Sequence, residues 1–114
     1  MIKMTMFLKR LPSLTRSEFV EHHIHTHGPL FRSIPEAERH VLRYIQTHPI
    51  SAPEGTVETA DFDGTAEIWF DSPEGMQAVL GSDTYKSRVF PDETTFLDHA
   101  NTLIQVGEQV EIIA

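Results

Sequence analysis

The pattern of apolar residues predicts an α+β protein with a ferredoxin-like βαββαβ fold, in which helices cover one face of an antiparallel four-stranded sheet. Four segments alternate apolar and polar residues, which is typical of β-strands, and two segments carry apolar residues at helical spacing after clear start signals. The length of 114 residues suffices for one domain with its own core, so we expect a single domain over residues 1–114.

End signals mark the first strand and the first helix. The stretch IKMTMFLKRL alternates apolar and polar side chains and predicts a strand. Thr15 then forms a capping box with Glu18, three residues later, which predicts the start of a helix. We expect this helix to end at His27, because Gly28 is a common C-terminal cap and Pro29 does not continue a regular helix.

The middle of the chain predicts two strands separated by a long connection. A turn region is expected over residues 33–38, followed by a strand over residues 40–48 (HVLRYIQTH). Residues 49–64 contain two prolines and two glycines, which predicts a loop. The third strand is expected over residues 65–71 (TAEIWFD), where the alternation returns.

The last third of the chain predicts a helical region and a closing strand. Ser72 is a typical N-cap, and the proline that follows it suits the first helical position. Tyr85 and Val89 continue the inward apolar stripe of this region, and Asp92 is expected to open a further short helical segment. The β-branched and aliphatic tail predicts a final strand from Thr102 to Ile113.

A single sheet with helices on one face leaves its other face uncovered. Apolar and aromatic side chains on the predicted strands are too numerous to lie under the helices together: Met4, Phe7, Tyr44, Trp69 and Val106. A large apolar face predicts burial against a second copy. We therefore expect a homodimer in which two sheets enclose a barrel-like interior, a dimeric α/β barrel.

Composition excludes several classes of function. The net charge of −8 argues against binding nucleic acid or an anionic membrane, because both need a basic surface. The absence of cysteine excludes disulfides, thiolate catalysis and cysteine-ligated zinc, and suits a reducing cytoplasm. The N-terminal residues do not resemble a signal peptide, and no apolar run is long enough to span a membrane.

Four of the seven histidines lie within the single stretch FVEHHIHTHGPL. Helical phase assigns them to different sides of the first helix: His23 and His27 point inward, His25 faces solvent, and His22 lies near the boundary. The same phase assigns further residues to the broad inward face, namely Phe19, Val20, Ile24 and Thr26.

The spacing of His23 and His27 is that of two zinc ligands on one helix face. The HExxH arrangement is absent, because His23 is followed by Ile24. Residues available to complete a metal site have no fixed distance from this pair: His48, Asp92, Glu93 and His99. For His23 we favour the alternative, in which it packs between helix and sheet with one nitrogen bonded to the backbone.

His27 has two interpretations of about equal weight. At a helix C-terminus the protonated imidazole is favoured, which would raise the pKa of His27 and suit it to general acid/base catalysis beside an apolar cavity. The alternative is a simple capping role, in which the imidazole binds the last carbonyl groups of the helix.

Polar residues also interrupt the predicted strands. Alternation places Tyr44, Gln46 and His48 on one face of their strand, and Glu67 and Trp69 on one face of theirs. A sheet face with this mixture suits a small-molecule pocket, which combines apolar walls with a few polar groups. The alternative is a dimer interface whose polar groups are hydrogen-bonded.

Several stretches resemble the EthD family of small dimeric α/β-barrel proteins: FLKRLPSLTRSEFVEHHIHTHGPL, YIQTH, FDGTAEIWFDSPEGMQAVLGS and DETTFLD. The family's first-helix pattern, F-x-x-H-W-x-x-x-H-G-P, is similar to this chain at Phe19, His22, His27, Gly28 and Pro29. His23 stands where the family usually has an aromatic residue, which adds polarity beside His27.

The resemblance implies the ferredoxin-like fold and the homodimer. Members include proteins encoded with ether-degrading monooxygenase systems, lactone isomerases and polyketide-tailoring enzymes, and related barrels include haem-handling proteins. Catalytic members use polar side chains in the barrel pocket for proton transfer, usually without a cofactor. Carried over by position, the resemblance implies His27 as a catalytic residue and, less directly, His22, Tyr44 and His48.

These observations lead to the hypothesis of a cofactor-independent homodimeric enzyme that acts on a hydrophobic or aromatic small molecule by proton transfer. His27 would be the acid/base, with Tyr44 or His48 stabilising an oxyanion or relaying the proton. The residues expected to bind the substrate are Phe7, His23, Glu67, Trp69 and Phe90. Two alternatives remain, a non-catalytic accessory or ligand-binding protein linked to a monooxygenase, and a haem or metal protein that uses His23, His27 or His48 as a ligand.

Overall fold

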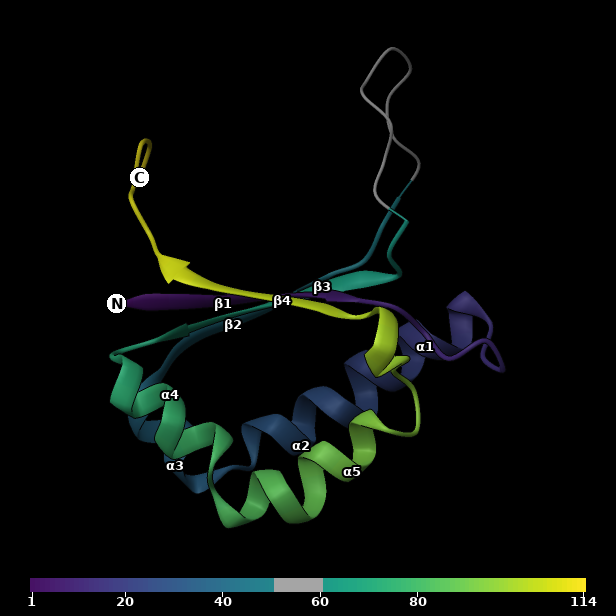
Figure 1. Ribbon diagram of the computed structural model, residues 1–114, viewed down its shortest axis with the longest axis horizontal. Helices are drawn as coiled ribbons and strands as arrows, with labels where there is room; N and C mark the ends of the chain where they lie inside the picture. Colours follow the sequence, from purple (N-terminus) through teal and green to yellow (C-terminus); the bar gives the residue numbers. More distant parts are fainter. Residues whose placement is uncertain (51–60) are drawn as a thin grey trace.

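The computed structural model describes residues 1–50 and 61–114, so most of the expected connection over residues 49–64 lies outside the described residues. Four strands form one antiparallel sheet in the order β2-β3-β1-β4, with all helices on one side (Figure 1). The strands are β1 (Ile2–Leu8), β2 (Val41–Thr47), β3 (Gly64–Phe70) and β4 (Leu103–Glu108). This arrangement confirms the predicted ferredoxin-like fold.

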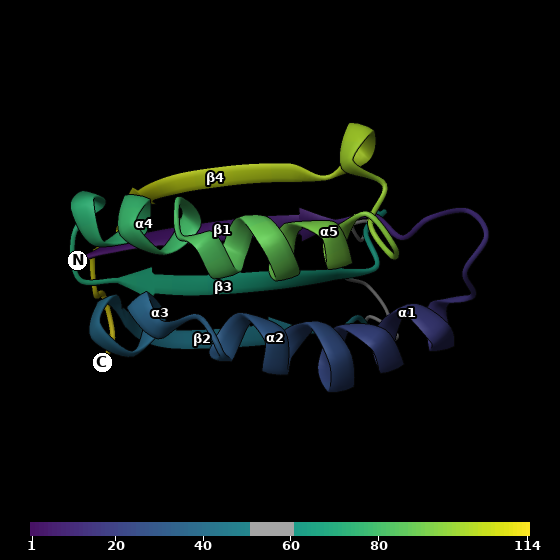
Figure 2. The same ribbon diagram turned by 90° about the horizontal axis from the view of Figure 1, so that it is seen from below.

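The helical layer consists of two rows, one between β1 and β2 and one between β3 and β4 in the chain (Figure 2). The first row comprises α1 (Arg16–His22), the π-helix η1 (His23–His27), α2 (Gly28–Arg32) and α3 (Pro35–His40). The second comprises α4 (Pro73–Leu80), the π-helix η2 (Tyr85–Val89), α5 (Phe90–Glu93) and the 3₁₀ turn η3 (His99–Asn101). None of the described helices is long and apolar enough to cross a membrane.

The predicted end of the first helix at His27 is wrong. Gly28 has ordinary right-handed helical angles, φ −55° and ψ −53°, and its N–H donates to the carbonyl of His23 five residues earlier. Pro29 has no N–H, and its ring would clash with the carbonyl four residues back in a regular α-helix. The wider π turn that precedes Pro29 lets the helix pass the proline instead of stopping.

The second row also has a π turn before a proline. The N–H of Phe90 donates to the carbonyl of Tyr85, again five residues earlier, and Pro91 follows at once. The helix therefore continues from η2 into α5, and Asp92 lies inside α5 instead of opening a new segment as predicted. In both rows a π turn directly precedes a glycine or phenylalanine followed by proline.

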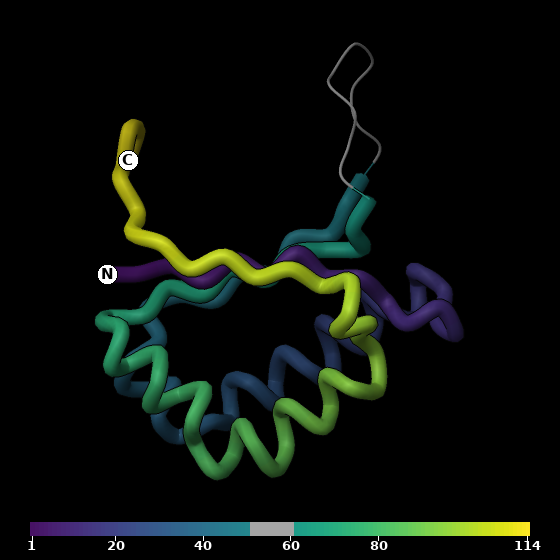
Figure 3. The backbone as a smooth tube through the Cα atoms, viewed as in Figure 1, coloured from purple at the N-terminus to yellow at the C-terminus, as the bar shows by residue number. Residues whose placement is uncertain are grey.

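Three further boundaries differ from the predictions. The expected turn over residues 33–38 is mostly α3, because Pro35 occupies the first helical turn after an extended Ile34. His40 ends α3, so β2 begins at Val41. The last strand ends at Glu108, and the remaining residues turn away from the sheet on the side opposite the helices (Figure 3).

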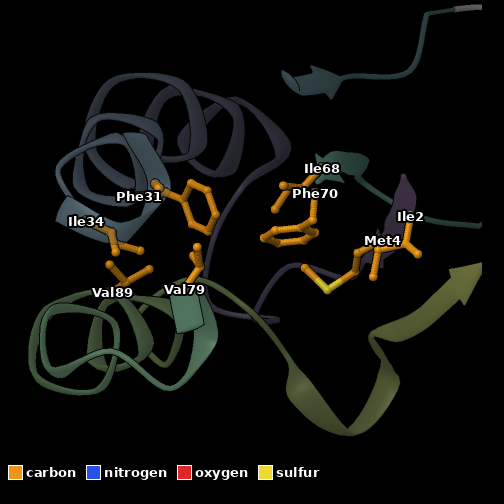
Figure 4. Close-up of a cluster of buried hydrophobic side chains, with 9 residues drawn as sticks. Ile2, Met4, Phe31, Ile34, Ile68, Phe70, Val79 and Val89 are labelled. Carbon is orange, nitrogen blue, oxygen red and sulfur yellow. The ribbon is translucent and has the colours of Figure 1, made fainter. Parts of the chain in front are cut away.

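The main core lies between the sheet and the two helical rows. In Figure 4, Ile34 and Val89 lie next to each other between the two helical rows, whereas Phe31 and Val79 lie nearer to Phe70, which is fully buried on the inner face of the sheet. A second cluster lies at the other end of the same layer and consists of Leu8, Phe19, Ala66, Phe96 and Leu97. Together these clusters join both helical rows to the inner face of the sheet.

The sheet divides the large side chains that were predicted to be too numerous for one face. Met4 pairs with Ile68 and with Val106, and all three face the helical side of the sheet. Phe7 and Trp69 face the open side, so part of the predicted surplus does lie outside the helical layer.

The open face is less apolar than the sequence predicted. Lys3 forms an ion pair with Glu67, and the cationic groups of Lys3 and Arg43 lie 4.9 and 5.1 Å from the ring centre of Trp69. The indole N–H donates to Gln109. Trp69 is therefore mostly covered within its own chain.

The capping box that the sequence predicts is present at the start of α1. The Thr15 side chain accepts the N–H of Glu18 at 3.1 Å, and the Glu18 carboxylate accepts the N–H of Thr15 at 2.9 Å, as predicted. Thr15→Ala should lower the free energy of unfolding by about 1 kcal/mol, measured by urea titration. Thr26→Ala, at an exposed position of η1, is the matched control and should change stability less; equal effects would contradict the capping role.

Candidate functional site

The structure distributes the four clustered histidines as helical phase predicted. His23 and His27 are buried, with 1% and 7% of their surface exposed, whereas His22 is half-buried and His25 is exposed. Ile24 and Thr26, which were also expected to face inward, are exposed. A π turn contains more residues than an α turn, so residues four apart lie more nearly above one another and the buried stripe is narrow.

Asp92 holds two of these histidines. Its Oδ2 lies 2.9 Å from Nδ1 of His27, and both carboxylate oxygens lie within 3.0 Å of Nε2 of His22. An ionised carboxylate only accepts hydrogen bonds, so each histidine donates to it from the nitrogen named. Nε2 of His27 is consequently the nitrogen left to act on a bound molecule. Asp92 also joins the two helical rows through charge-assisted hydrogen bonds.

His23 forms a hydrogen bond with His48, with 2.9 Å between Nδ1 and Nε2. The partner of His23 is therefore another imidazole and not the backbone group that we expected. Burial, followed by the proximity of His48, His27 and His22, lowers the pKa of His23 to about 3. Burial also lowers the pKa of His48. The two rings form a neutral pair at neutral pH, in which one donates and the other accepts.

Tyr44 and Gln46 connect β2 to the π turn. The Gln46 amide donates to the Tyr44 hydroxyl oxygen and to the carbonyl of His23, both at 2.8 Å. Burial is the main cause of the raised pKa of Tyr44, to which the charge of Glu93 contributes. Tyr44 thus stays protonated at neutral pH, and because its oxygen already accepts from Gln46, its own proton is available to a third group.

Glu93, next to Asp92, brings a second carboxylate into the interior. Only 5% of its surface is exposed. Its Oε2 accepts the hydroxyl of Tyr85 at 2.7 Å, and its Oε1 lies 3.1 Å from Nε2 of His99. Burial, and then the charge and hydrogen bond of Glu93, raise the pKa of Tyr85.

Two hollows of very different size adjoin these side chains. An interior cavity of about 20 Å³ is lined by polar groups from both rows and the sheet, including His23, His27, Tyr44, Tyr85 and Glu93. This volume has room for about one water molecule. A groove of about 930 Å³ runs along α2, α3 and the edge strand β2, with walls that include Ile24, Pro29, Arg32, Leu42 and Gln46. That volume is in the range of small-molecule sites.

Phe31 and Tyr44 separate the two hollows. Both residues line the groove and the cavity, and their rings meet edge to face with centres 5.1 Å apart. A molecule in the groove is therefore one layer of side chains away from His27.

The predicted substrate-binding residues do not converge on this interior. Phe7, Glu67 and Trp69 lie on the open face of the sheet, so the backbone of the sheet separates them from Tyr44, Gln46 and His48. The predicted single pocket of these polar residues is thus divided between two faces, because the registers of β2 and β3 place their polar residues on opposite sides. Phe90 is 47% exposed and stacks on His99 at the outer side of the helical layer.

The described residues contain no group of three or more histidine, aspartate or glutamate side chains arranged to hold a metal ion. His22 and His27 each form a hydrogen bond with Asp92.

Most of the chain matches the model of a known protein family. The family model of the EthD domain matches residues 11–100. The chain belongs to the EthD family. Comparison with curated proteins found no match.

One solved structure agrees with this EthD assignment, and two more distant ones share the fold. An ethyl tert-butyl ether D (EthD) family protein from Bacillus halodurans is 25% identical, with a TM-score of 0.73 over 96% of this chain and 99% of that one. A DABB family protein with a ferredoxin-like fold from Mesorhizobium loti is 12% identical, with a TM-score of 0.70 over 96% and 97%. A dimeric ferredoxin-like protein of unknown function from Thermobifida fusca is 13% identical, with a TM-score of 0.66 over 95% and 90%.

Sequence reasoning on this EthD protein undervalued three residues of the interior. Asp92 and Glu93 were assigned no function except that of possible metal ligands, and Tyr85 was considered only as part of an apolar stripe. The signal was present, because Tyr85, Val89 and Glu93 are spaced by four residues and so share one helix face. A glutamate that continues an inward stripe is expected to be buried and paired.

The neutral pair of His23 and His48 should make this EthD protein sensitive to acid. The pKa of His23 is about 3 in the folded protein, against 6.5 for a free side chain, so the unfolded chain binds an extra proton between these values. The contribution of His23 to the free energy of unfolding should therefore be fully present above pH 6.5 and should be lost as the pH decreases toward 3. Between pH 7 and pH 4.5 this residue should account for a loss of about 3 kcal/mol.

The measurement is urea unfolding at both pH values for the wild type and for His23→Phe, which keeps a ring between Phe19 and Phe96. The variant should lose about 3 kcal/mol less than the wild type on acidification. His25→Phe, at the exposed position, is the control and should behave like the wild type. An identical acid response in wild type and His23→Phe would refute a buried neutral His23.

Proposed function

We propose that this EthD protein is a homodimeric, cofactor-independent enzyme that binds a hydrophobic or aromatic small molecule and catalyses proton transfer, such as isomerisation, dehydration or decarboxylation. The observation that carries the proposal is the position of His27. It is buried, anchored through Nδ1 by Asp92, and lines an interior cavity together with Tyr44. The lack of cysteine in the whole chain supports a cytoplasmic location.

The geometry suggests a division of roles during proton transfer. Nε2 of His27 takes a proton from the carbon beside a carbonyl group of the substrate, and the electrons of that C–H bond pass to the carbonyl oxygen to give an enolate. The hydroxyl group of Tyr44 donates a hydrogen bond to this oxygen. Asp92 stabilises the imidazolium that forms, and His27 then returns the proton at another atom of the substrate.

The sizes of the two hollows determine how a substrate would reach His27. The interior cavity has room for about one water, so the body of the substrate has to occupy the groove along β2. We infer that the rings of Phe31 and Tyr44 move apart on binding and join the groove to the cavity. Tyr44 would then contact the reacting group directly, as the oxyanion role requires.

Replacement of His27 tests the catalytic role. With a panel of hydrophobic aryl ketones and lactones in D₂O, the wild type should accelerate exchange of the carbon-bound proton, followed by NMR. His27→Gln should slow this exchange about 10²- to 10⁴-fold, because glutamine keeps the polar contact but is not a base. Circular dichroism verifies the fold, and His25→Gln is the control with full activity.

The same experiment distinguishes the second candidate function, that of a non-catalytic ligand-binding or accessory protein. The size of the groove favours it, since its volume of about 930 Å³ is in the range of small-molecule sites and the buried histidines lie behind its wall. Saturable binding of panel compounds without any proton exchange, in wild type and His27→Gln alike, would support this alternative and overturn the enzymatic proposal.

Homodimerisation through the open face of the sheet is the remaining part of the proposal. The T. fusca neighbour is described as dimeric, and the open face carries apolar side chains from three strands, including Phe7, Ile45 and Leu103. Leu103 and Ile104 are exposed to nearly the same extent, 57% and 59%, but face opposite sides of β4. They therefore form a matched pair for a test.

Leu103→Glu should convert the dimer to a monomer, because it buries a charge in the interface, whereas Ile104→Glu should leave the dimer intact. Size-exclusion chromatography with light scattering measures the mass of each variant. A wild-type monomer, or equal effects of the two substitutions, would rule out association through this face.

A further inference from the structure

Glu93 is a buried carboxylate whose two oxygens face different parts of the protein. Oε2 accepts the hydroxyl of Tyr85, and both residues line the interior cavity. Oε1 lies 3.1 Å from Nε2 of His99, whose side chain is 40% exposed. The acid–base mechanism built on His27 and Asp92 makes no use of these three side chains.

His99 is placed to exchange protons with solvent. Its ring stacks on Phe90, with centres 5.4 Å apart and planes 29° apart, which holds Nε2 toward Glu93. An imidazole accepts a proton on one nitrogen and releases another from its second nitrogen, and it does so near neutral pH. The exposed ring therefore links bulk water to a carboxylate that solvent does not reach directly.

We propose that Glu93 and His99 form a proton relay that connects the interior cavity with solvent. The proposal deepens the proposed function and rests on it in one respect, that the cavity is where protons are transferred. In the inward direction, Nδ1 of His99 takes a proton from water, and the Nε2 proton passes to Oε1 of Glu93. Solvent loses one proton, the carboxyl group gains one, and the imidazole ends neutral.

The protonated Glu93 then supplies the cavity. Rotation of its carboxyl group brings this proton to the cavity side, where it passes to a molecule held there. With Tyr85, the carboxyl proton moves to the tyrosine oxygen while the tyrosine hydroxyl proton moves to the carboxyl group, so both groups keep their charge. Glu93 and His27 line the same cavity, which has room for about one water. Asp92 and Glu93 therefore have complementary tasks: the first orients the acid/base His27, and the second exchanges protons with the outside.

A purely structural role is the competing explanation. Glu93 also ties η2 to η3, because Tyr85 and His99 belong to these two elements. A structural tie needs only hydrogen bonds, whereas a relay needs a group that changes its protonation. His99→Gln separates the two, because the glutamine amide still donates to Glu93 but does not relay a proton.

The test follows the hydroxyl proton of Tyr85 by NMR, using ¹³C-labelled tyrosine in an equal mixture of H₂O and D₂O. The isotope shift at Cζ reports how fast this proton exchanges with solvent. His99→Gln and Glu93→Gln should each slow the exchange about tenfold or more, with melting temperatures close to that of the wild type. His25→Gln, an exposed histidine on the other helical row, should exchange like the wild type.

Equal exchange rates in wild type and His99→Gln, whether fast or slow, would overturn the relay. Loss of folding in His99→Gln is addressed by Glu93→Gln, which keeps an acceptor for Tyr85. The measurement needs no substrate, so its outcome is independent of the catalytic test on His27. Slowed exchange without any turnover of the panel compounds would support the relay and reject the enzymatic proposal. Unchanged exchange in the variants, together with turnover by the wild type, would support the enzymatic proposal and reject the relay.

Discussion

The helical layer has to pass two prolines without breaking, and the interior of the protein depends on how it does so. Pro29 and Pro91 each follow a π turn, in which a hydrogen bond spans five residues instead of four. The first π turn aligns His23 and His27 toward the sheet, and the second aligns Tyr85 with the helix that carries Asp92 and Glu93. A regular helix that stopped at Gly28 would leave β2 without its cover and His27 at a frayed end.

Two consecutive carboxylates then organise the polar groups that these turns bring inside. Asp92 takes the donors of His22 and His27, and Glu93 takes those of Tyr85 and His99, so each buried charge has partners from more than one element. Buried polar groups are tolerated when their hydrogen bonds are satisfied, and this network meets that condition. It also places the imidazole of His27, the hydroxyl of Tyr85 and the carboxylate of Glu93 around a space for about one water.

The two faces of the sheet carry different sets of side chains. Its inner face carries Tyr44, Gln46 and the cavity, whereas its outer face carries the clamped Trp69 and the apolar side chains that we assign to a dimer interface. The groove along the edge strand β2 is large enough for a small molecule, and the rings of Phe31 and Tyr44 stand between it and the cavity that His27 lines. Under the proposed function, movement of this pair of aromatic rings would couple binding to proton transfer.

The amino-acid sequence by itself determined the strands, the capping box of Thr15, the inward phase of His23 and His27, and the family. Each of these depends on contacts within one element or on residues a few positions apart, where periodicity is informative. Only the tertiary structure decided that the helix passes Pro29, that Asp92 meets histidines 65 and 70 residues away, and that Glu67 and Tyr44 lie on opposite faces. Periodicity assigns a residue to a face of its own element, but the partner across the interior follows from strand register and helix packing, which are long-range properties.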